Sequence, residues 1–392
     1  MKSLMSGARW LGTVATAGLL LALVPGAATA ALPVPGAADV AALTAGTARS
    51  LAVGWTAPVV AVSPDGAKAY VGVIDDDGAR TTVLKVVDTA TGTVTTALTL
   101  STTPGTYVNS LALGPDGTRL YAVVGSARLV TVDTAAGTVL ADVPLPAQPR
   151  PDGYLEGVVG SLAVAPDGAG VYLAQAGPRQ RFGARPGRVL AYSTATGAFT
   201  ATIELPGDGV GSIVLRPDGA DAYVTTSAGL VHLGVTPTAL TVVRTFTDGH
   251  GASGSAVLSP DGGTLYGFGN SASDYTVDTA TDTVTSGFHF APGHGDLRSP
   301  VVSPDGHRVY VVSQSSGVMG PGAPYPQGPY YSSVILAYDT EAGALVPAES
   351  VYPPSVGLTH NLVLGPDGRT FHLAGNVSPS AGVVAGLDII TR

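Results

Sequence analysis

The sequence has no cysteine among its 392 residues, and this absence excludes disulfides, thiol chemistry and a lipid-modified cysteine after a signal peptide. Charged residues are also scarce, at 12%, and acidic residues outnumber basic ones by 28 to 19. A chain with a formal net charge of −9 and no general basic character gives no indication of a nucleic-acid partner, so we expect none. Without disulfides, the folded protein must rest on its hydrophobic core.

The first thirty residues carry a pattern of their own. Lys2 and Arg9 accompany an apolar stretch at 11–24, which is too short to span a membrane comfortably. The segment ends in Ala-Thr-Ala, a signal-peptidase motif, so we expect secretion, cleavage after Ala30 and no membrane association afterwards. The expected organisation is a signal peptide, a flexible leader and one folded domain, at 1–30, 31–45 and 46–392.

Glycine and proline, in contrast, are abundant, with 53 and 30 residues. Many fall in one recurring unit, first seen as VVAVSPDGAKAYVGV at 59–73, in which alternating apolar runs flank a Pro-Asp-Gly turn. Proline presets the second turn position, aspartate can hold the turn through its side chain, and glycine takes the positive φ. The unit occurs seven times, with its turn aspartate at positions 65, 116, 167, 218, 261, 305 and 367.

Each repeat contains four expected strands. Strands a and b flank the Pro-Asp-Gly turn, and strands c and d flank a second turn, typified by KVVDTATGTV at 85–94. Seven such units predict an all-β fold, a seven-bladed β-propeller of four-stranded antiparallel blades. The last repeat lacks strand d, whereas the strand at 46–54 has no partner before it, so we expect this N-terminal strand to close the ring.

Two residue types recur too regularly to mark one active site. The turn aspartates occur in every unit, so we interpret them as scaffold rather than as catalytic or metal-binding carboxylates. In each repeat, the position five residues after the turn aspartate holds an aromatic ring between apolar neighbours. This pattern indicates contacts between blades. These residues are Tyr70, Tyr121, Tyr172, Tyr223, Tyr266 and Tyr310, with His372 in the last repeat.

The pattern V-x-P-D-G-x-x-x-Y-V, followed by V-x-D-T-x-T-G, resembles the YVTN-type propeller repeat of secreted and surface proteins of bacteria and archaea. The resemblance extends over residues 46–392 and implies the propeller fold. Related propellers include lactonases of the 6-phosphogluconolactonase type. The Gly-Pro-Arg-His segment associated with those lactonases is missing, and GHGDLRSP at 293–300 is the nearest stretch.

The b-to-c and d-to-a loops should lie on the face opposite the repeated turns, which we call the top face. These loops differ between repeats, as is typical of a binding surface. The insertion at 313–333 contains Tyr325, Tyr330 and Tyr331, which suit an aromatic wall for a ligand; the alternative is an irregular loop without a partner.

A second insertion, at 175–189, holds the one arginine cluster of the chain. Its residues Arg179, Arg181, Arg185 and Arg188 suit a carboxylate, a phosphate or an acidic glycan, because arginine binds such anions in bidentate fashion. The alternative is a solvated loop that balances charge.

Candidate metal and catalytic residues lie in the other top-face loops. Asp75 and Asp77 in IDDDGAR suit Ca²⁺, although their spacing completes no calcium loop. Histidines and carboxylates in the d-to-a loops would face the channel mouth, where they could bind a divalent metal or perform acid/base chemistry; the alternative is polar residues in contact with water. These channel-mouth candidates are Glu156, His250, His294 and His360, with Arg298 as a neighbouring anion-binding residue.

Two functions remain open from the sequence. The first is a secreted binding or scaffold module that uses its top-face loops and channel mouth for a protein, glycan or small-molecule ligand. The alternative is an extracellular, lactonase-like hydrolase or lyase with a histidine/carboxylate site, with or without a divalent metal. The sequence identifies no other cofactor, and we expect a monomer.

Overall fold

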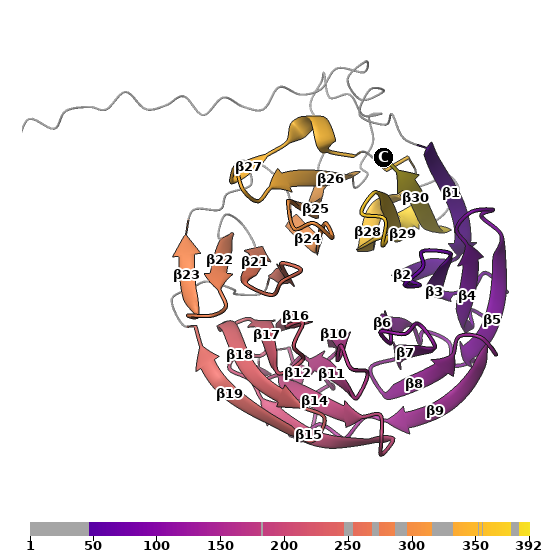
Figure 1. The fold of residues 1–392 in the computed structure, drawn as a ribbon. Coiled ribbons are helices and arrows are strands. Elements are labelled where there is room, and N and C mark those ends of the chain that lie inside the picture. The colour runs from indigo at the N-terminus through magenta and orange to yellow at the C-terminus, as the bar shows by residue number, and fades with distance from the viewer. Residues whose placement is uncertain are drawn as a thin grey trace, which may run out of the picture. The chain divides into compact units, whose positions relative to one another are not determined.

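The repeats form seven four-stranded antiparallel sheets, the blades of a β-propeller, within the residues that the computed structural model describes (Figure 1). These residues belong to the compact unit Pro35–Arg392. None of the helices among them is long and apolar enough to cross a membrane. The described residues are 47–181, 183–246, 254–268, 274–286, 296–315, 332–351, 353–354, 356–377 and 384–392.

Successive blades follow the repeats, with strand a innermost and strand d outermost (Figure 1). Blades 1 to 4 contain β2 (Thr56–Val62), β3 (Lys68–Ile74), β4 (Thr82–Asp88), β5 (Val94–Ser101); β6 (Val108–Leu113), β7 (Arg119–Val124), β8 (Arg128–Asp133), β9 (Thr138–Pro144); β10 (Val159–Val164), β11 (Gly170–Gln175), β14 (Arg188–Ser193), β15 (Ala198–Glu204); and β16 (Val210–Leu215), β17 (Asp221–Thr226), β18 (Gly229–Thr236), β19 (Ala239–Thr245). Blades 5 to 7 contain β20 (Ser255–Leu258), β21 (Thr264–Phe268), β22 (Tyr275–Asp278), β23 (Thr283–Ser286); β24 (Asp296–Val302), β25 (Arg308–Ser315), β26 (Ser332–Asp339), β27 (Ala344–Leu345); and β28 (Val356–Leu364), β29 (Thr370–Val377), β30 (Val384–Thr391), β1 (Thr47–Gly54). Outside the blades lie the hairpin β12 (Arg179–Gln180) and β13 (Gly183–Ala184) and the short 3₁₀ helix η1 (Pro347–Glu349).

The N-terminal strand closes the ring, as predicted. β1 pairs antiparallel with β30, with Leu51 opposite Leu387, and so supplies the outer strand that the last repeat lacks. From β1, the Arg49 guanidinium donates a hydrogen bond of 2.9 Å to the Ala90 carbonyl in the c-to-d turn of blade 1. The closing strand therefore completes blade 7 by sheet pairing and contacts blade 1 through the Arg49 side chain.

Hydrophobic clusters lie between all seven pairs of neighbouring blades among the described residues. The recurring ring position belongs to this core, because its six tyrosines and His372 are all at most 8% exposed. The predicted structural role of these residues is confirmed. His372 is 1% exposed, and burial lowers the pKa of its imidazole from 6.5 to about 4, so this ring is neutral in the fold.

The Pro-Asp-Gly turns of neighbouring blades touch one another. The turn glycines all have φ between +66° and +76°, and a Cβ on any of them would lie 2.5–3.6 Å from the proline ring of the preceding blade's turn. The contact of Gly66 with Pro366 joins the first blade to the last, so the chain of turn contacts is closed. Glycine is thus needed here both for its conformation and for the close approach of the next turn.

The turn aspartates are used within their own turns, which supports the scaffold interpretation. Asp65, for example, accepts hydrogen bonds from the Ser63 hydroxyl at 2.5 Å and the Ala67 amide at 3.0 Å, and these bonds lower the pKa of its carboxyl. The c-to-d turns lie at the same edge, since the Thr89 hydroxyl donates to the Gly66 carbonyl at 2.7 Å. This edge is the bottom face.

Blades 5 and 6 each depart from the repeat in their outer strands or turns. In blade 6, β27 has only two residues, because Pro347 follows closely and cannot donate a sheet hydrogen bond. In blade 5, Asp282 occupies, at φ +54°, the turn position that is glycine in most other repeats. Its carboxylate accepts a 2.9 Å hydrogen bond from the Tyr223 hydroxyl and lies 2.9 Å from Nδ1 of the buried His232, so this departure ties blade 5 to blade 4.

Candidate functional site

Several candidate residues lie outside the described part of the chain. The side chain of His360 is among them, although its backbone belongs to β28. The structure therefore does not test whether these residues converge at the channel mouth. The others are His250, His294, Tyr325, Tyr330 and Tyr331.

The carboxylates of the first b-to-c loop are engaged within that loop and its flanking strand. Asp75 forms an ion pair of 2.7 Å with Lys85, and Asp76 forms one of 2.6 Å with Arg80. Asp77 accepts a hydrogen bond from the Thr81 hydroxyl, which lowers the pKa of this carboxyl. Among the described residues, no group of three or more histidine, cysteine or acidic side chains is arranged to hold a metal ion.

Glu156 and Arg298 lie on different blades. The Glu156 carboxylate forms a 2.8 Å ion pair with Arg150 and accepts a 3.3 Å hydrogen bond from the Gln148 amide nitrogen. Arg298 is exposed on β24, opposite Val312 of β25. The described contacts of the Glu156 carboxylate include no histidine.

The arginine insertion folds against the long loop that leads into blade 3. The Leu155 amide donates to the Arg179 carbonyl at 2.9 Å, and the Arg179 amide donates back to Leu155 at 3.1 Å. The Arg185 guanidinium lies 5.9 Å from the Tyr154 ring centroid. We call the surface formed by Tyr154, Leu155, Arg179, Arg181 and Arg185 the arginine platform.

Arg188 does not belong to this surface, although the sequence groups it with the other arginines. Its side chain is 4% exposed and donates hydrogen bonds to Gln175 Oε1 at 2.8 Å, to the Pro146 carbonyl at 2.5 Å and to the Ala147 carbonyl at 3.2 Å. Burial lowers the pKa of the Arg188 guanidinium, and the nearby Glu156 opposes this shift. Arg188 is therefore a support beneath the platform.

Two glutamines complete this support. Gln148 donates to the Ala176 carbonyl at 2.9 Å and accepts from the Gly157 amide at 2.9 Å, while Gln175 donates to the Gly157 carbonyl at 2.8 Å. A Cβ on Gly157 would overlap the Ala176 carbonyl, so glycine is required for the two loops to approach this closely. A buried polar network thus holds the platform in place, which a solvated loop without tertiary contacts would lack.

The exposed part of the platform combines apolar and cationic groups. Leu155 is 72% exposed, and Arg179, Arg181 and Arg185 are exposed on the insertion that pairs with it. The Arg179 side chain makes no hydrogen bond or ion pair with any residue that the structure describes. This composition resembles the anchors of protein interfaces, where arginine and aromatic residues are enriched.

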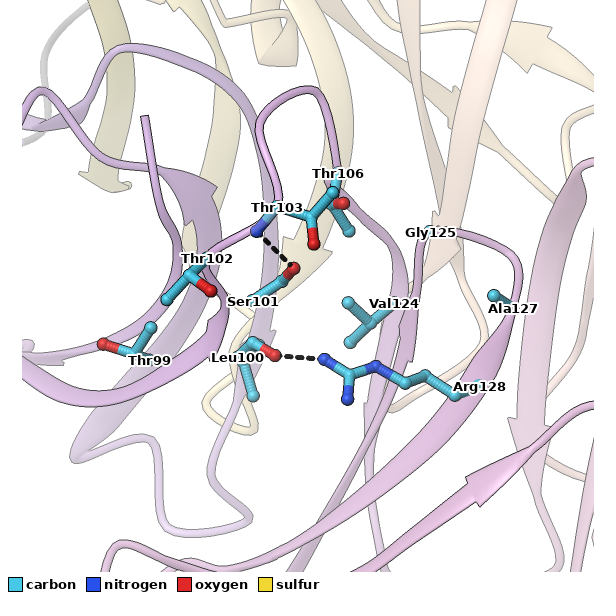
Figure 2. Close-up of a pocket in the computed structure, with 10 residues that line it drawn as sticks. All are labelled: Thr99, Leu100, Ser101, Thr102, Thr103, Thr106, Val124, Gly125, Ala127 and Arg128. Atoms are coloured by element: carbon cyan, nitrogen blue, oxygen red, sulfur yellow. Dashed lines mark hydrogen bonds between the residues drawn. The ribbon is translucent and has the colours of Figure 1, made fainter. Parts of the chain in front are cut away.

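A cavity of about 550 Å³ lies at the top of blades 1 and 2 (Figure 2). We call it the hydroxyl pocket, because most of its side chains are threonine or serine. The end of β5, the loop after it and the turn between β7 and β8 form its walls. Its lining residues are Thr99, Leu100, Ser101, Thr102, Thr103, Thr106, Val124, Gly125, Ala127 and Arg128.

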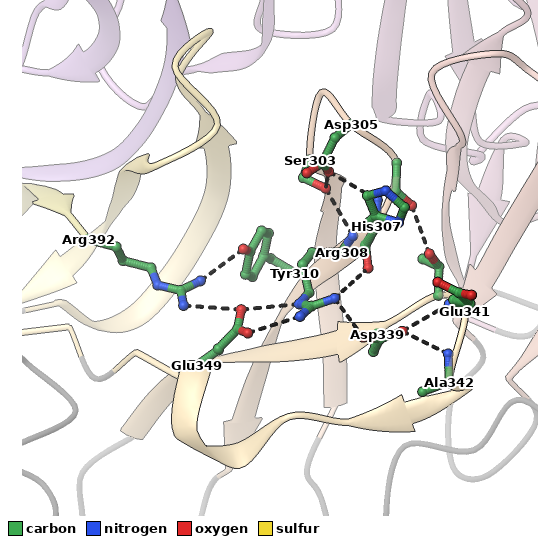
Figure 3. A network of polar contacts seen from close by, with 12 residues as sticks. Ser303, Asp305, His307, Arg308, Tyr310, Asp339, Glu341, Ala342, Glu349 and Arg392 are labelled. Atoms are coloured by element: carbon green, nitrogen blue, oxygen red, sulfur yellow. Dashed lines mark hydrogen bonds and ion pairs between the residues drawn. The ribbon is translucent and has the colours of Figure 1, made fainter.

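A second cavity, of about 530 Å³, lies at the bottom of blades 6 and 7 and is occupied by an ion-pair network (Figure 3). Glu349 accepts two hydrogen bonds from Arg308, at 3.0 and 3.1 Å, and one from Arg392 at 3.1 Å. Arg392 also donates to the Tyr310 hydroxyl at 2.8 Å, and Arg308 bonds Asp339 at 2.7 Å. The hydrogen bonds from Arg308 hold the pKa of the Glu349 carboxyl below its usual range. The charges of these groups balance one another, and their hydrogen bonds join blade 6 to blade 7. We therefore interpret the network as a link between blades and not as a ligand site.

Sequence reasoning identified the arginines of the platform but not Tyr154, Leu155 or the hydroxyl pocket. One signal was available for the platform. An additional Pro-Asp-Gly at 151–153 lies outside the repeat pattern and marks the inserted loop that carries both residues. The pocket left no such signal, because its lining residues come from ordinary strand ends and turns.

Comparison with known proteins supports the fold. The chain is similar to a solved structure described as the crystal structure of the mitotic checkpoint complex, with a TM-score of 0.60 and 16% sequence identity. The similarity covers 88% of this chain and 91% of the other. No protein-family model and no curated protein matches the sequence. At this identity the similarity shows the β-propeller fold alone.

Proposed function

We propose that this chain is a secreted binding module that docks an acidic protein on its arginine platform. The single observation that carries the proposal is the exposed Leu155, which pairs with the arginine insertion at Arg179 above a buried network of hydrogen bonds. The propeller fold commonly serves as a scaffold or binding module, in agreement with this role. No described arrangement of residues favours the hydrolase or lyase alternative.

The chemistry of the platform favours a protein over a polyanionic sugar. Guanidinium groups form bidentate hydrogen bonds with carboxylates, which provides the electrostatic part of recognition. An exposed leucine next to a tyrosine adds an apolar contact that an acidic peptide with a hydrophobic side chain could bury. The acidic chain as a whole repels acidic partners elsewhere on its surface, so complementary charge would orient the partner toward this site.

Binding can be tested by fluorescence anisotropy with a labelled peptide of glutamate and phenylalanine. We expect the combined change Arg179→Ala, Arg181→Ala and Arg185→Ala to weaken binding about tenfold or more. The matched control is Arg369→Ala, which removes an exposed arginine from a bottom turn and should leave binding unchanged. Equal binding by the platform variant and the native chain would refute the proposal.

A second variant separates the two kinds of acidic partner. Leu155→Ala should weaken binding of the peptide but not of a heparin fragment of similar charge, because only the peptide offers an apolar side chain. If heparin binds more tightly than the peptide and Leu155→Ala changes neither, the platform is a polyanion site and the protein-docking proposal is wrong.

Secretion is the other part of the proposal. It is supported by the charged and apolar pattern of residues 1–30 and by the resemblance of the repeats to the YVTN-type repeat of secreted proteins. N-terminal sequencing of the protein recovered from the culture medium should begin at Ala31. Retention of the full-length chain inside the cell would contradict export.

A further inference from the structure

The hydroxyl pocket presents polar groups that the fold itself does not use. Thr99, Thr102, Thr103 and Thr106 line the cavity, and their hydroxyls make no hydrogen bond to any residue that the structure describes. Each hydroxyl can donate one hydrogen bond and accept two. The Thr103 and Thr106 hydroxyls lie among the other lining residues and therefore offer both donors and acceptors to a ligand (Figure 2).

The loop that carries these threonines is fixed by other bonds. The Ser101 hydroxyl accepts from the Thr103 amide at 3.1 Å, and the Thr106 amide donates to the Thr103 carbonyl at 3.2 Å. From blade 1, the Thr82 hydroxyl donates to the Thr106 carbonyl at 2.6 Å. The backbone that carries the free hydroxyls is consequently fixed, which lowers the entropy cost of ordering this loop around a ligand.

Among the described lining residues, Arg128 is the one charged group, and its charge is neutralised. Arg128 crosses one side of the cavity and donates to the Leu100 carbonyl (Figure 2). Its other terminal nitrogen forms a 2.6 Å ion pair with Asp142. A guanidinium paired in this way attracts an anion only weakly, but its remaining N–H groups still donate hydrogen bonds.

We propose that the hydroxyl pocket binds a neutral saccharide. A sugar presents neighbouring hydroxyls that match the free threonine hydroxyls and the Arg128 donors, and it needs no opposite charge. The cavity volume of about 550 Å³ falls within the range of about 300–1,000 Å³ for small-molecule sites. Tyr107 follows the lining residue Thr106 in the chain and is 38% exposed. This site is separate from the arginine platform, so the two proposals stand or fall independently.

Saturation-transfer NMR on the purified full chain tests the proposal with glucose, galactose, mannose and N-acetylglucosamine, and with maltose and cellobiose. We expect saturation transfer to at least one of these neutral sugars. The double variant Thr103→Val and Thr106→Val should weaken its binding about tenfold, because both changes keep the shape of the side chain and remove the hydroxyl. Thr96→Val, at an exposed position of β5 outside the pocket, is the matched control and should bind as the native chain does.

Three results would overturn this proposal. These are no transfer to any neutral sugar, equal binding by the double variant and the native chain, or tighter binding of glucuronate than of glucose. Unfolding transitions of the variants establish that a loss of binding does not reflect a loss of fold. The platform variant with three alanines should bind the sugar normally, which distinguishes a failure at this pocket from a failure of the proposed docking site.

Discussion

The two faces of the propeller use the same sheets in different ways. On the bottom face, each Pro-Asp-Gly turn touches the next, and the turn aspartates bond their own backbone. On the top face, the loops differ from blade to blade and leave polar groups such as the Thr103 and Thr106 hydroxyls without partners in the described chain. Repeated residues therefore form contacts within and between blades, whereas residues that vary between repeats include groups that remain accessible to ligands.

The sharpest test of this contrast compares one glycine from each face. In Gly262→Ala, the new Cβ would lie 2.5 Å from Pro217 at φ +72°, so we expect the free energy of unfolding to fall by about 3–4 kcal/mol. Gly78→Ala, in a top loop at φ +76°, has no atom within 4 Å of its Cβ and should lose only about 1–2 kcal/mol. Equilibrium urea unfolding measures the free energy of unfolding of both variants. Equal losses would show that the close contact between turns does not contribute to the cost of the Gly262→Ala change.

His372 tests whether a departure inside the repeated core has a measurable cost. Because its pKa is lowered from 6.5 to about 4 in the fold, the unfolded chain binds more protons between these values. The associated stability should be complete above pH 6.5 and decline by up to about 3 kcal/mol as the pH falls to 4.

The variant His372→Tyr restores the residue of the other repeats. Urea unfolding of the native chain and of this variant should show the contribution of His372 to the pH dependence of the unfolding free energy. The variant should lose less stability than the native chain between pH 6.5 and pH 4. His372→Phe serves as a second variant without a titrating ring. Parallel pH profiles for all three proteins would contradict a neutral buried histidine.

Asp282 tests a departure at the bottom face itself. Asp282→Gly restores the common turn residue and relieves the strain of a non-glycine residue at positive φ. It also removes the carboxylate that bonds Tyr223 and His232. Because both of these rings are buried, we expect a net loss of about 2 kcal/mol in unfolding free energy. Asp282→Asn, which keeps a hydrogen-bond acceptor, should lose less. A more stable glycine variant would mean that the repeat pattern outweighs the link between blades.

The smallest effect on stability is expected at the top face. Arg179→Ala should change the free energy of unfolding by less than about 0.5 kcal/mol, since its exposed side chain has no bonded partner among the described residues. Thermal unfolding measures this change alongside peptide binding. A large loss of stability would place Arg179 with the scaffold instead of with the binding surface.

Much of the fold was predictable because its determinants are local. Alternating apolar runs and the Pro-Asp-Gly turn specify a hairpin within about fifteen residues, and seven copies specify the number of blades. Closure by β1 followed from the missing outer strand of the last repeat. The candidate site was predictable only in part, because Arg188 looks like its neighbours in the sequence but points into a buried network.

The sequence by itself determined the all-β fold, the seven blades, the closing strand and the structural role of the repeated turns. Only the tertiary structure decided which turns touch, which arginine is buried and where threonine hydroxyls gather around a cavity. The physical reason is the range of the interactions involved. A hairpin depends on neighbours along the chain, whereas Gly66 meets Pro366, and Thr82 meets Thr106, only after the blades have assembled.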